Sequence, residues 1–98
     1  MKVSSDEMMA CAKFRSKERL PSLTYVHKAT GAFMFRCSQP RSGLMNRIDA
    51  GDQKMLTEIA ALNQNNALTI FDARNYPSAS ANRVKGGGFE DERYYPNC

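Results

Sequence analysis

Hydrophobic and polar residues recur along this chain with spacings that predict short helices and strands. Near the start, Ser4-x-x-Glu7 forms a capping box, in which the Ser4 hydroxyl accepts from the Glu7 amide and the Glu7 carboxylate reaches back. Asp6 adds a negative charge in the first turn, where the helix dipole favours it. We therefore predict a helix that ends near Phe14. Its expected buried stripe comprises Met8, Met9 and Ala12, with Cys11 as a further member.

The next pattern is that of a β-hairpin. Two β-prone runs, Leu23–Lys28 and Ala32–Cys37, are joined by Ala29-Thr30-Gly31. Three residues with glycine last suit a hairpin loop in which Gly31 has a positive φ. Pro40 follows the second run and cannot donate to a ladder, so the strand ends before it.

A second amphipathic helix is expected to start at Asp49 or Asp52 and to run to about Leu62. Its apolar face follows helical spacing and comprises Met55, Leu56, Ile59 and Leu62.

The remaining elements are short. Leu68–Phe71 is a mostly apolar run with polar flanks, which is typical of a buried parallel strand. Ser78 or Ser80 is then expected to cap a helix through Lys85, with Gly86 as its left-handed end. The order helix, hairpin, helix, strand, helix predicts an α/β or α+β domain.

Length and composition indicate one small soluble domain. The 98 residues are 42% hydrophobic and 24% charged, and neither a membrane-spanning run nor a signal peptide is recognisable. The three cysteines form no CxxC pair, which favours reduced thiols. His27 is the only histidine, so the sequence predicts no metal site.

The positive charge is concentrated in the first half. Residues 1–48 carry nine lysines or arginines against three acids, whereas residues 49–98 carry five against seven. Such a basic half suits an anionic membrane or nucleic acid, but a solvated surface is the favoured interpretation. No RNA-recognition or aromatic-flanked basic motif occurs, so we predict no nucleic-acid partner.

Six short blocks between Lys13 and Tyr95 carry a family resemblance through their joint order. They are FRSKERLP, LTYVHK, RCSQP, FDAR, ANRVKGGGFE and RYYP. Together they resemble the amino-terminal part of a myotubularin-type phosphatase domain, so residues 1–98 are expected to form part of such a domain. The resemblance implies an incomplete sheet of a protein-tyrosine-phosphatase-like α/β fold. It also implies phosphatidylinositol 3-phosphate and 3,5-bisphosphate as substrates, hydrolysed at the 3-position without a metal or other cofactor.

The family's nucleophile lies in a Cys-x5-Arg loop that this chain does not contain. Six residues after Cys11 is Lys17, six after Cys37 is Gly43, and Cys98 is the last residue. We therefore assign no catalytic residue, and we expect a fragment that is inactive by itself. It would arise by truncation, a gene-model break or a degenerated gene. The alternative is a non-catalytic binding or adaptor protein derived from the same domain, so whether the chain acts as an enzyme stays open.

Asn82 is the candidate substrate-binding residue. It matches the asparagine of the family's AN[KR]xKGGGYE segment, which lines the phosphoinositide headgroup pocket, although Phe89 replaces the usual tyrosine. An amide can donate to phosphate oxygens, whereas the alternative is an ordinary polar residue on a helix. The run Gly86–Gly88 is interpreted as a helix stop rather than a phosphate cradle.

Other residues of the shared blocks have two interpretations each. Arg15, Arg19 and Pro21 would either attract an anionic lipid surface or fix the path of the chain through contacts with loop carbonyls and carboxylates. Asp72 and Arg74 lie where ligands often bind in α/β sheets, but a salt bridge or a helix cap is favoured. We favour the structural role for all five.

The resemblance also implies the partners and the location. The partners would be a phosphoinositide headgroup, a membrane surface and a myotubularin-type dimer partner. The location would be cytoplasmic, peripheral to endosomal membranes.

Overall fold

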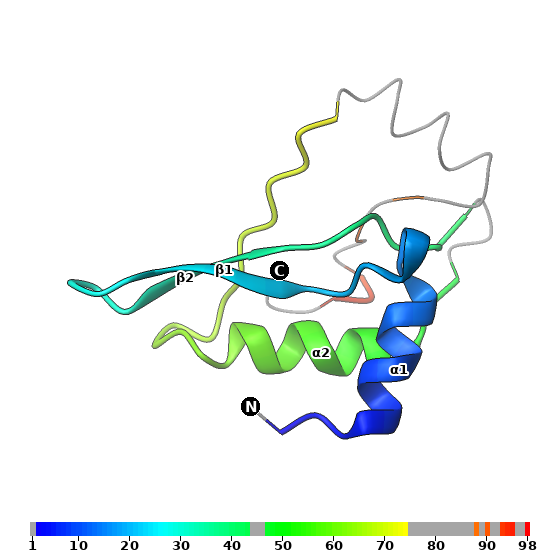
Figure 1. Cartoon of the computed structure of the whole chain (residues 1–98), viewed down its shortest axis with the longest axis horizontal. Helices are drawn as coiled ribbons and strands as arrows, with labels where there is room; N and C mark the ends of the chain where they lie inside the picture. Colours follow the sequence, from blue (N-terminus) through cyan, green and yellow to red (C-terminus); the bar gives the residue numbers. More distant parts are fainter. Residues whose placement is uncertain (1, 44–46, 75–87, 89, 91–92, 96–97) are drawn as a thin grey trace.

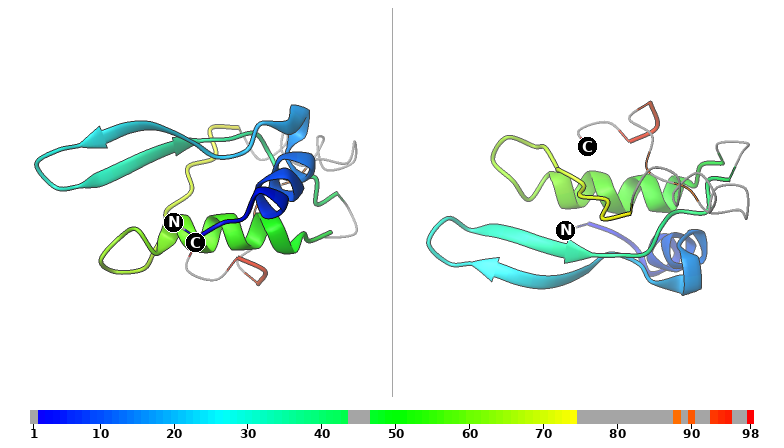
Figure 2. Two further views of the ribbon diagram at one scale, coloured as in Figure 1. Left: turned by 60° about the horizontal axis from the view of Figure 1, so that its bottom comes forward. Right: turned by 90° about the horizontal axis from the view of Figure 1, so that it is seen from above.

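The computed structural model describes residues 2–43, 47–74, 88, 90, 93–95 and 98. This part of the chain contains two helices and one two-stranded antiparallel sheet (Figure 1). In chain order the elements are α1 (Ser5–Phe14), the 3-10 turn η1 (Ser16–Glu18), β1 (Ser22–His27), β2 (Ala32–Arg36) and α2 (Ala50–Ala60). The hairpin lies alongside α2 in both views of Figure 2. This is a small α/β arrangement, and the helix predicted up to Lys85 lies outside the described residues.

Both helices begin where the sequence predicted. Ser4 caps α1, its hydroxyl accepting from the Glu7 amide at 3.1 Å while the Glu7 carboxylate accepts from the Ser4 amide at 2.9 Å. Asp49 caps α2 by accepting from the Asp52 amide at 2.9 Å. Local hydrogen bonds therefore fix the two starting points.

Gly51 allows the two helices to come into close contact where α1 crosses the first turn of α2 (Figure 1). A Cβ atom at Gly51 would lie 2.7 Å from the Glu7 carbonyl oxygen and 2.8 Å from the Ala10 Cβ. This crossing corrects the predicted stripe of α1, because Met8 and Met9 are exposed and only Cys11 is buried. The face that meets α2 is rotated by about one residue toward Glu7, Ala10, Cys11 and Phe14.

Gly31 has the predicted positive φ, but the loop is Lys28–Gly31, one residue longer than predicted, because β1 ends at His27. The two faces of the hairpin follow from the register. Gly31 has φ +73°, and the His27 carbonyl accepts from the amides of Thr30 and Gly31. Two cross-strand pairs, Leu23–Phe35 and Val26–Phe33, share the face on which Phe35 packs against the core. Three pairs, Ser22–Arg36, Tyr25–Met34 and His27–Ala32, share the opposite face. A bulge between Leu23 and Tyr25 places these two side chains on opposite faces of the hairpin, opposite Phe35 and Met34 respectively.

The core is small and lies around α2. Met55, Leu56 and Ile59 are buried as predicted, together with Cys11 and Tyr95. Leu62 is exposed because α2 ends at Ala60, two residues earlier than expected.

The predicted strand Leu68–Phe71 is wrong. These residues have no regular secondary structure, and the Phe71 side chain is 91% exposed. A strand is defined by hydrogen bonds to a neighbour, and in the described residues the only paired strands are β1 and β2. An apolar run therefore cannot become a strand here by composition alone.

Two consecutive residues after α1 have a left-handed backbone. Lys17 has φ +54° and Glu18 has φ +57°, a region that is unfavourable for residues with a Cβ. They turn the chain from α1 into β1.

Neither helix in this described portion is long and apolar enough to cross a membrane.

Candidate functional site

Arg15 is the centre of a buried polar cluster. It follows α1 directly as the C-cap, and its side chain is fully buried. Its Nε donates to Asp52 Oδ1 at 2.8 Å and its Nη2 to Asp52 Oδ2 at 2.9 Å, a bidentate ion pair between the end of α1 and the first turn of α2. Its Nη1 donates to the Ser38 carbonyl at 3.1 Å and to Glu90 Oε2 at 3.2 Å. One guanidinium therefore connects both helices, the end of the hairpin and the carboxy-terminal block.

Asp52 is saturated by its neighbours. Besides the two Arg15 bonds, its Oδ1 accepts from Cys11 Sγ at 3.1 Å and its Oδ2 accepts from the Tyr95 hydroxyl. A carboxylate offers about four lone-pair positions, and all four are occupied. Among the described residues, no buried side-chain nitrogen or oxygen lacks a hydrogen-bond partner. The described buried polar atoms of the cluster all have hydrogen-bond partners, so the cluster is suited to structural support.

The thiols near this cluster are held in the neutral form. Burial, followed by the hydrogen bond to Asp52, raises the pKa of Cys11 to about 12. Burial also raises the pKa of Cys37, against the opposing effect of the nearby Arg15 guanidinium. The thiolate is the reactive species, so neither cysteine is activated as a nucleophile at neutral pH. The same two causes, burial and the Asp52 hydrogen bond, raise the pKa of Tyr95.

The sequence favours a buried, inert thiol at Cys37, because this residue ends an apolar β-prone run with no histidine nearby in sequence, and the predicted burial is wrong. It is exposed as a whole, although its sulfur lies 3.6 Å from Arg15 Nη1. The strand β2 ends at Arg36, so Cys37 follows the sheet, and its sulfur accepts from Arg15 Nη1.

A second polar group connects Asp72 and Arg74 to the turn after β2. Arg74 Nε and Nη2 donate to the two Asp72 carboxylate oxygens at 2.9 and 2.7 Å, so the predicted salt bridge is confirmed. Arg74 also donates to the Gln39 side-chain oxygen and, at 2.8 Å, to the Gly88 carbonyl. Gly88 is tightly packed there, because an added Cβ would lie 2.0 Å from Ser42 Oγ. Residues 74 and 88 are therefore fixed to each other and to residues 39–42.

The residues singled out from the sequence have different outcomes. Arg15 has the structural role that we favoured, and Pro21 is buried, whereas the Arg19 side chain is exposed. Asn82 lies outside the described residues. Among the residues that the structure describes, no group of three or more His, Cys, Asp or Glu side chains could hold a metal ion.

Sequence reasoning missed the acidic partners of Arg15, which are Asp52 and Glu90, and the Tyr95 phenol that donates to Asp52. Asp52 was considered only as a helix cap, and Glu90 and Tyr95 only as members of shared blocks. They lie 37, 75 and 80 positions from Arg15, so no local spacing connects them. The available signal was physical: an arginine at the junction of two apolar elements needs carboxylates if it is buried.

Comparison with known proteins identifies the family. The profile described as "Myotubularin-like phosphatase domain" matches residues 1–98. The chain belongs to this family. It is 39% identical over 98 residues to "Myotubularin" of Rattus norvegicus and 39% identical over 96 residues to "Myotubularin" of Xenopus laevis. It is 40% identical over 97 residues to "Phosphatidylinositol-3,5-bisphosphate 3-phosphatase MTMR2" of Bos taurus.

The match covers nearly all of this chain but a small part of each relative. It covers 97–99% of the chain, but 16% of each of the two myotubularins and 15% of the bovine phosphatase. The Arg15 cluster of this myotubularin-like chain therefore lies in a segment that corresponds to only 15–16% of the length of these relatives.

Proposed function

We propose that these 98 residues act as part of a phosphoinositide 3-phosphatase domain, with phosphatidylinositol 3-phosphate and 3,5-bisphosphate as substrates. The observation that carries the proposal is the family match over residues 1–98. It is supported by the name of the bovine relative, a phosphatidylinositol-3,5-bisphosphate 3-phosphatase.

Within such a domain this segment would supply support and substrate contacts, and not the nucleophile. The 98 residues contain no Cys-x5-Arg sequence, and the thiols of Cys11 and Cys37 have raised pKa values. The Arg15 cluster would hold the two helices and the hairpin in a fixed arrangement. Asn82 would donate hydrogen bonds to the lipid headgroup from the segment whose flanking residues, Arg74 and Gly88, are bonded to each other.

The first test is phosphate release from phosphatidylinositol 3-phosphate. We expect the 98-residue chain alone to be inactive, because nucleophilic catalysis needs the thiolate and the phosphate-binding arginine. Activity that copurifies with the intact chain would contradict this proposal.

The second test completes the domain. Residues 1–98 replace the matching segment of the bovine phosphatase, and kinetics are measured with and without Asn82→Ala. We expect the hybrid to be active and the substitution to lower kcat/KM about two- to tenfold, because a hydrogen bond contributes about 0.5–1.5 kcal/mol. Unchanged kinetics with a lower melting temperature would make Asn82 a structural residue and would contradict the assignment.

The binding or adaptor alternative predicts a chain that is stable by itself. Small exposed apolar side chains are common on stable proteins, but here large ones occur on α1, on the hairpin and at Phe71. We therefore expect the isolated chain to be marginally stable and to associate. A sharp and reversible melting transition of a monomer would favour the adaptor function. Location on endosomal membranes is also part of the proposal, to be tested by imaging of the tagged protein.

A further inference from the structure

The hairpin lies in a part of the chain that has no acidic residue. Between Glu18 and Asp49 there is no aspartate or glutamate. The same stretch contains five exposed basic residues, which are Arg19, Lys28, Arg36, Arg41 and Arg47. Arg36 ends β2, Lys28 lies in the turn and Arg19 precedes β1, so three of these cations are close to the hairpin in sequence.

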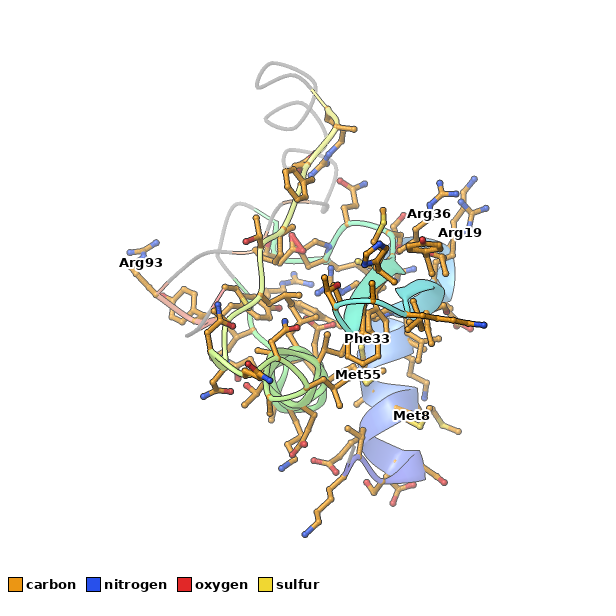
Figure 3. All side chains as sticks on the ribbon, turned by 90° about the vertical axis from the view of Figure 1, so that its left-hand side faces the viewer. Met8, Arg19, Phe33, Arg36, Met55 and Arg93 are labelled. Atoms are coloured by element: carbon orange, nitrogen blue, oxygen red, sulfur yellow. The ribbon has the colours of Figure 1, made fainter. Side chains whose placement is uncertain are left out.

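The two faces of this hairpin differ in character. The inward face carries Phe33 and Phe35, and Figure 3 shows Phe33 on the side of Met55 in α2. We call the opposite face, made of Ser22, Tyr25, His27, Ala32, Met34 and Arg36, the outer hairpin face. Figure 3 shows Arg36 on that side beside Arg19, away from α2.

The outer hairpin face has apolar side chains in its centre and cations at both ends. Tyr25 and Met34 are paired across the strands and are 53% and 61% exposed. Arg36 lies at one end, and the turn that contains Lys28 lies at the other. Exposed aromatic and apolar side chains flanked by cations are typical of surfaces that lie at the boundary between lipid headgroups and acyl chains.

The positive charge of the outer hairpin face distinguishes between three possible binding partners, which are a second copy of the chain, another protein surface and a lipid surface. A second copy of the chain would bring like cations together, which is unfavourable in a symmetric contact. A protein that covered this face would have to supply an acidic partner for Arg36, and that occupant is one outcome of the test below. A negatively charged lipid surface provides both the counter-charge and an apolar layer.

We propose that the outer hairpin face docks this protein on an anionic lipid membrane. Tyr25 and Met34 enter the interfacial layer, while Arg19, Lys28 and Arg36 lie among the lipid phosphates. The inference deepens the proposed function, since it names the surface that would bring the segment to a lipid substrate. It is tested without phosphoinositide, so a failure of the proposed catalytic role does not affect its outcome.

The test is co-sedimentation of the hybrid phosphatase described above with vesicles of phosphatidylcholine alone or of phosphatidylcholine with phosphatidylserine. We expect binding only to the anionic vesicles. Binding should weaken with salt, because the screening length falls from about 10 Å at 0.1 M to about 3 Å at 1 M.

Charge reversal at one position distinguishes the outer hairpin face from net charge. Arg36→Glu should weaken vesicle binding at least about fivefold, the effect of one basic residue near an anionic membrane. Arg93→Glu is the matched control with the same change in net charge, and Arg93 lies on the other side of the molecule (Figure 3). It should change binding less than Arg36→Glu does. Tyr25→Ser should weaken binding with no change in net charge.

Three results would overturn the inference. The first is equal weakening by Arg36→Glu and Arg93→Glu, which would mean that net charge alone governs binding. The second is a dimer that dissociates in Arg36→Glu, which would assign the face to a second copy. The third is that Arg36→Glu and Tyr25→Ser leave vesicle binding by the hybrid phosphatase unchanged. That result would mean that other parts of the protein cover the outer hairpin face. Melting of each variant verifies that the fold is retained.

Discussion

Asp52→Ala should be the most damaging single substitution in the described part of this chain. Asp52 is fully buried and accepts four hydrogen bonds, two of them from the Arg15 guanidinium. Without it, Arg15 stays buried with Glu90 as its remaining ion-pair partner, at 3.2 Å. Removal of one partner of a buried ion pair costs about 3–5 kcal/mol. The Tyr95 hydroxyl and the Cys11 thiol lose their acceptor as well.

The size of this loss can be compared with the stability of the whole domain. Small domains are stable by about 5–15 kcal/mol, so Asp52→Ala removes a large share of that. A larger protein shifts less in Tm per kcal/mol than a 98-residue domain, about 2–4 °C at 150–250 residues, so the quantity to compare is the free energy of unfolding. The assay is urea unfolding and thermal melting of the hybrid phosphatase described above.

Asp72→Ala is the matched control, because Asp72 also forms a bidentate pair with an arginine. That pair is partly exposed, and exposed ion pairs contribute about 0–1 kcal/mol. A loss for Asp52→Ala no greater than that for Asp72→Ala would refute the reasoning. The double variant Arg15→Met with Asp52→Leu should recover only part of the loss, since it removes both charges of the pair but takes from Glu90 its Arg15 partner.

Four further predictions follow from single features. Gly51→Ala should cost about 1–2 kcal/mol, because crowding at the helix crossing exceeds the better helix propensity of alanine; no loss would mean that the helices separate freely. Glu18→Gly should stabilise by about 0.5–1 kcal/mol by relieving its positive φ, and a lower Tm would contradict this. The folded Cys11 thiol keeps its proton to about pH 12, whereas an unfolded thiol loses it near pH 9.0, so stability should fall between these values. Cys11→Ser should flatten that fall, and an unchanged pH dependence would show that other groups cause it. Cys37 should react slowly with iodoacetamide at neutral pH, and rapid native labelling would mean that its thiolate is accessible.

Features that depend on neighbours three or four residues apart were predictable from the sequence. The Ser4–Glu7 capping box, the Asp49 cap and the Gly31 loop all involve short separations, and all three were confirmed. The apolar face of α2 was also correct for its buried members, since helical period alone defines it.

Features that depend on distant partners were not predictable. The orientation of α1 depends on the close contact at Gly51 of the other helix. The periodicity of α1 alone therefore placed Met8 and Met9 in the buried stripe, although both are exposed. Leu68–Phe71 has strand-like composition but no strand beside it in the described structure. The Arg15 cluster joins residues up to 80 positions apart, and charge pairs of that separation leave no periodic trace in a sequence.

The wide separation of the residues around Arg15 also has a consequence for folding during synthesis. Ribosomes add about 5–20 residues per second, so Glu90, 75 positions later, is made about 4–15 s after Arg15. Both helices and the hairpin can form within microseconds of their own synthesis. Once Asp52 has been made, 37 positions after Arg15, the guanidinium can pair with it, but it still has neither Glu90 nor the Tyr95 hydroxyl that completes the Asp52 shell. The nascent chain therefore contains an unfinished polar centre that water and chaperones can reach until the carboxy-terminal block arrives.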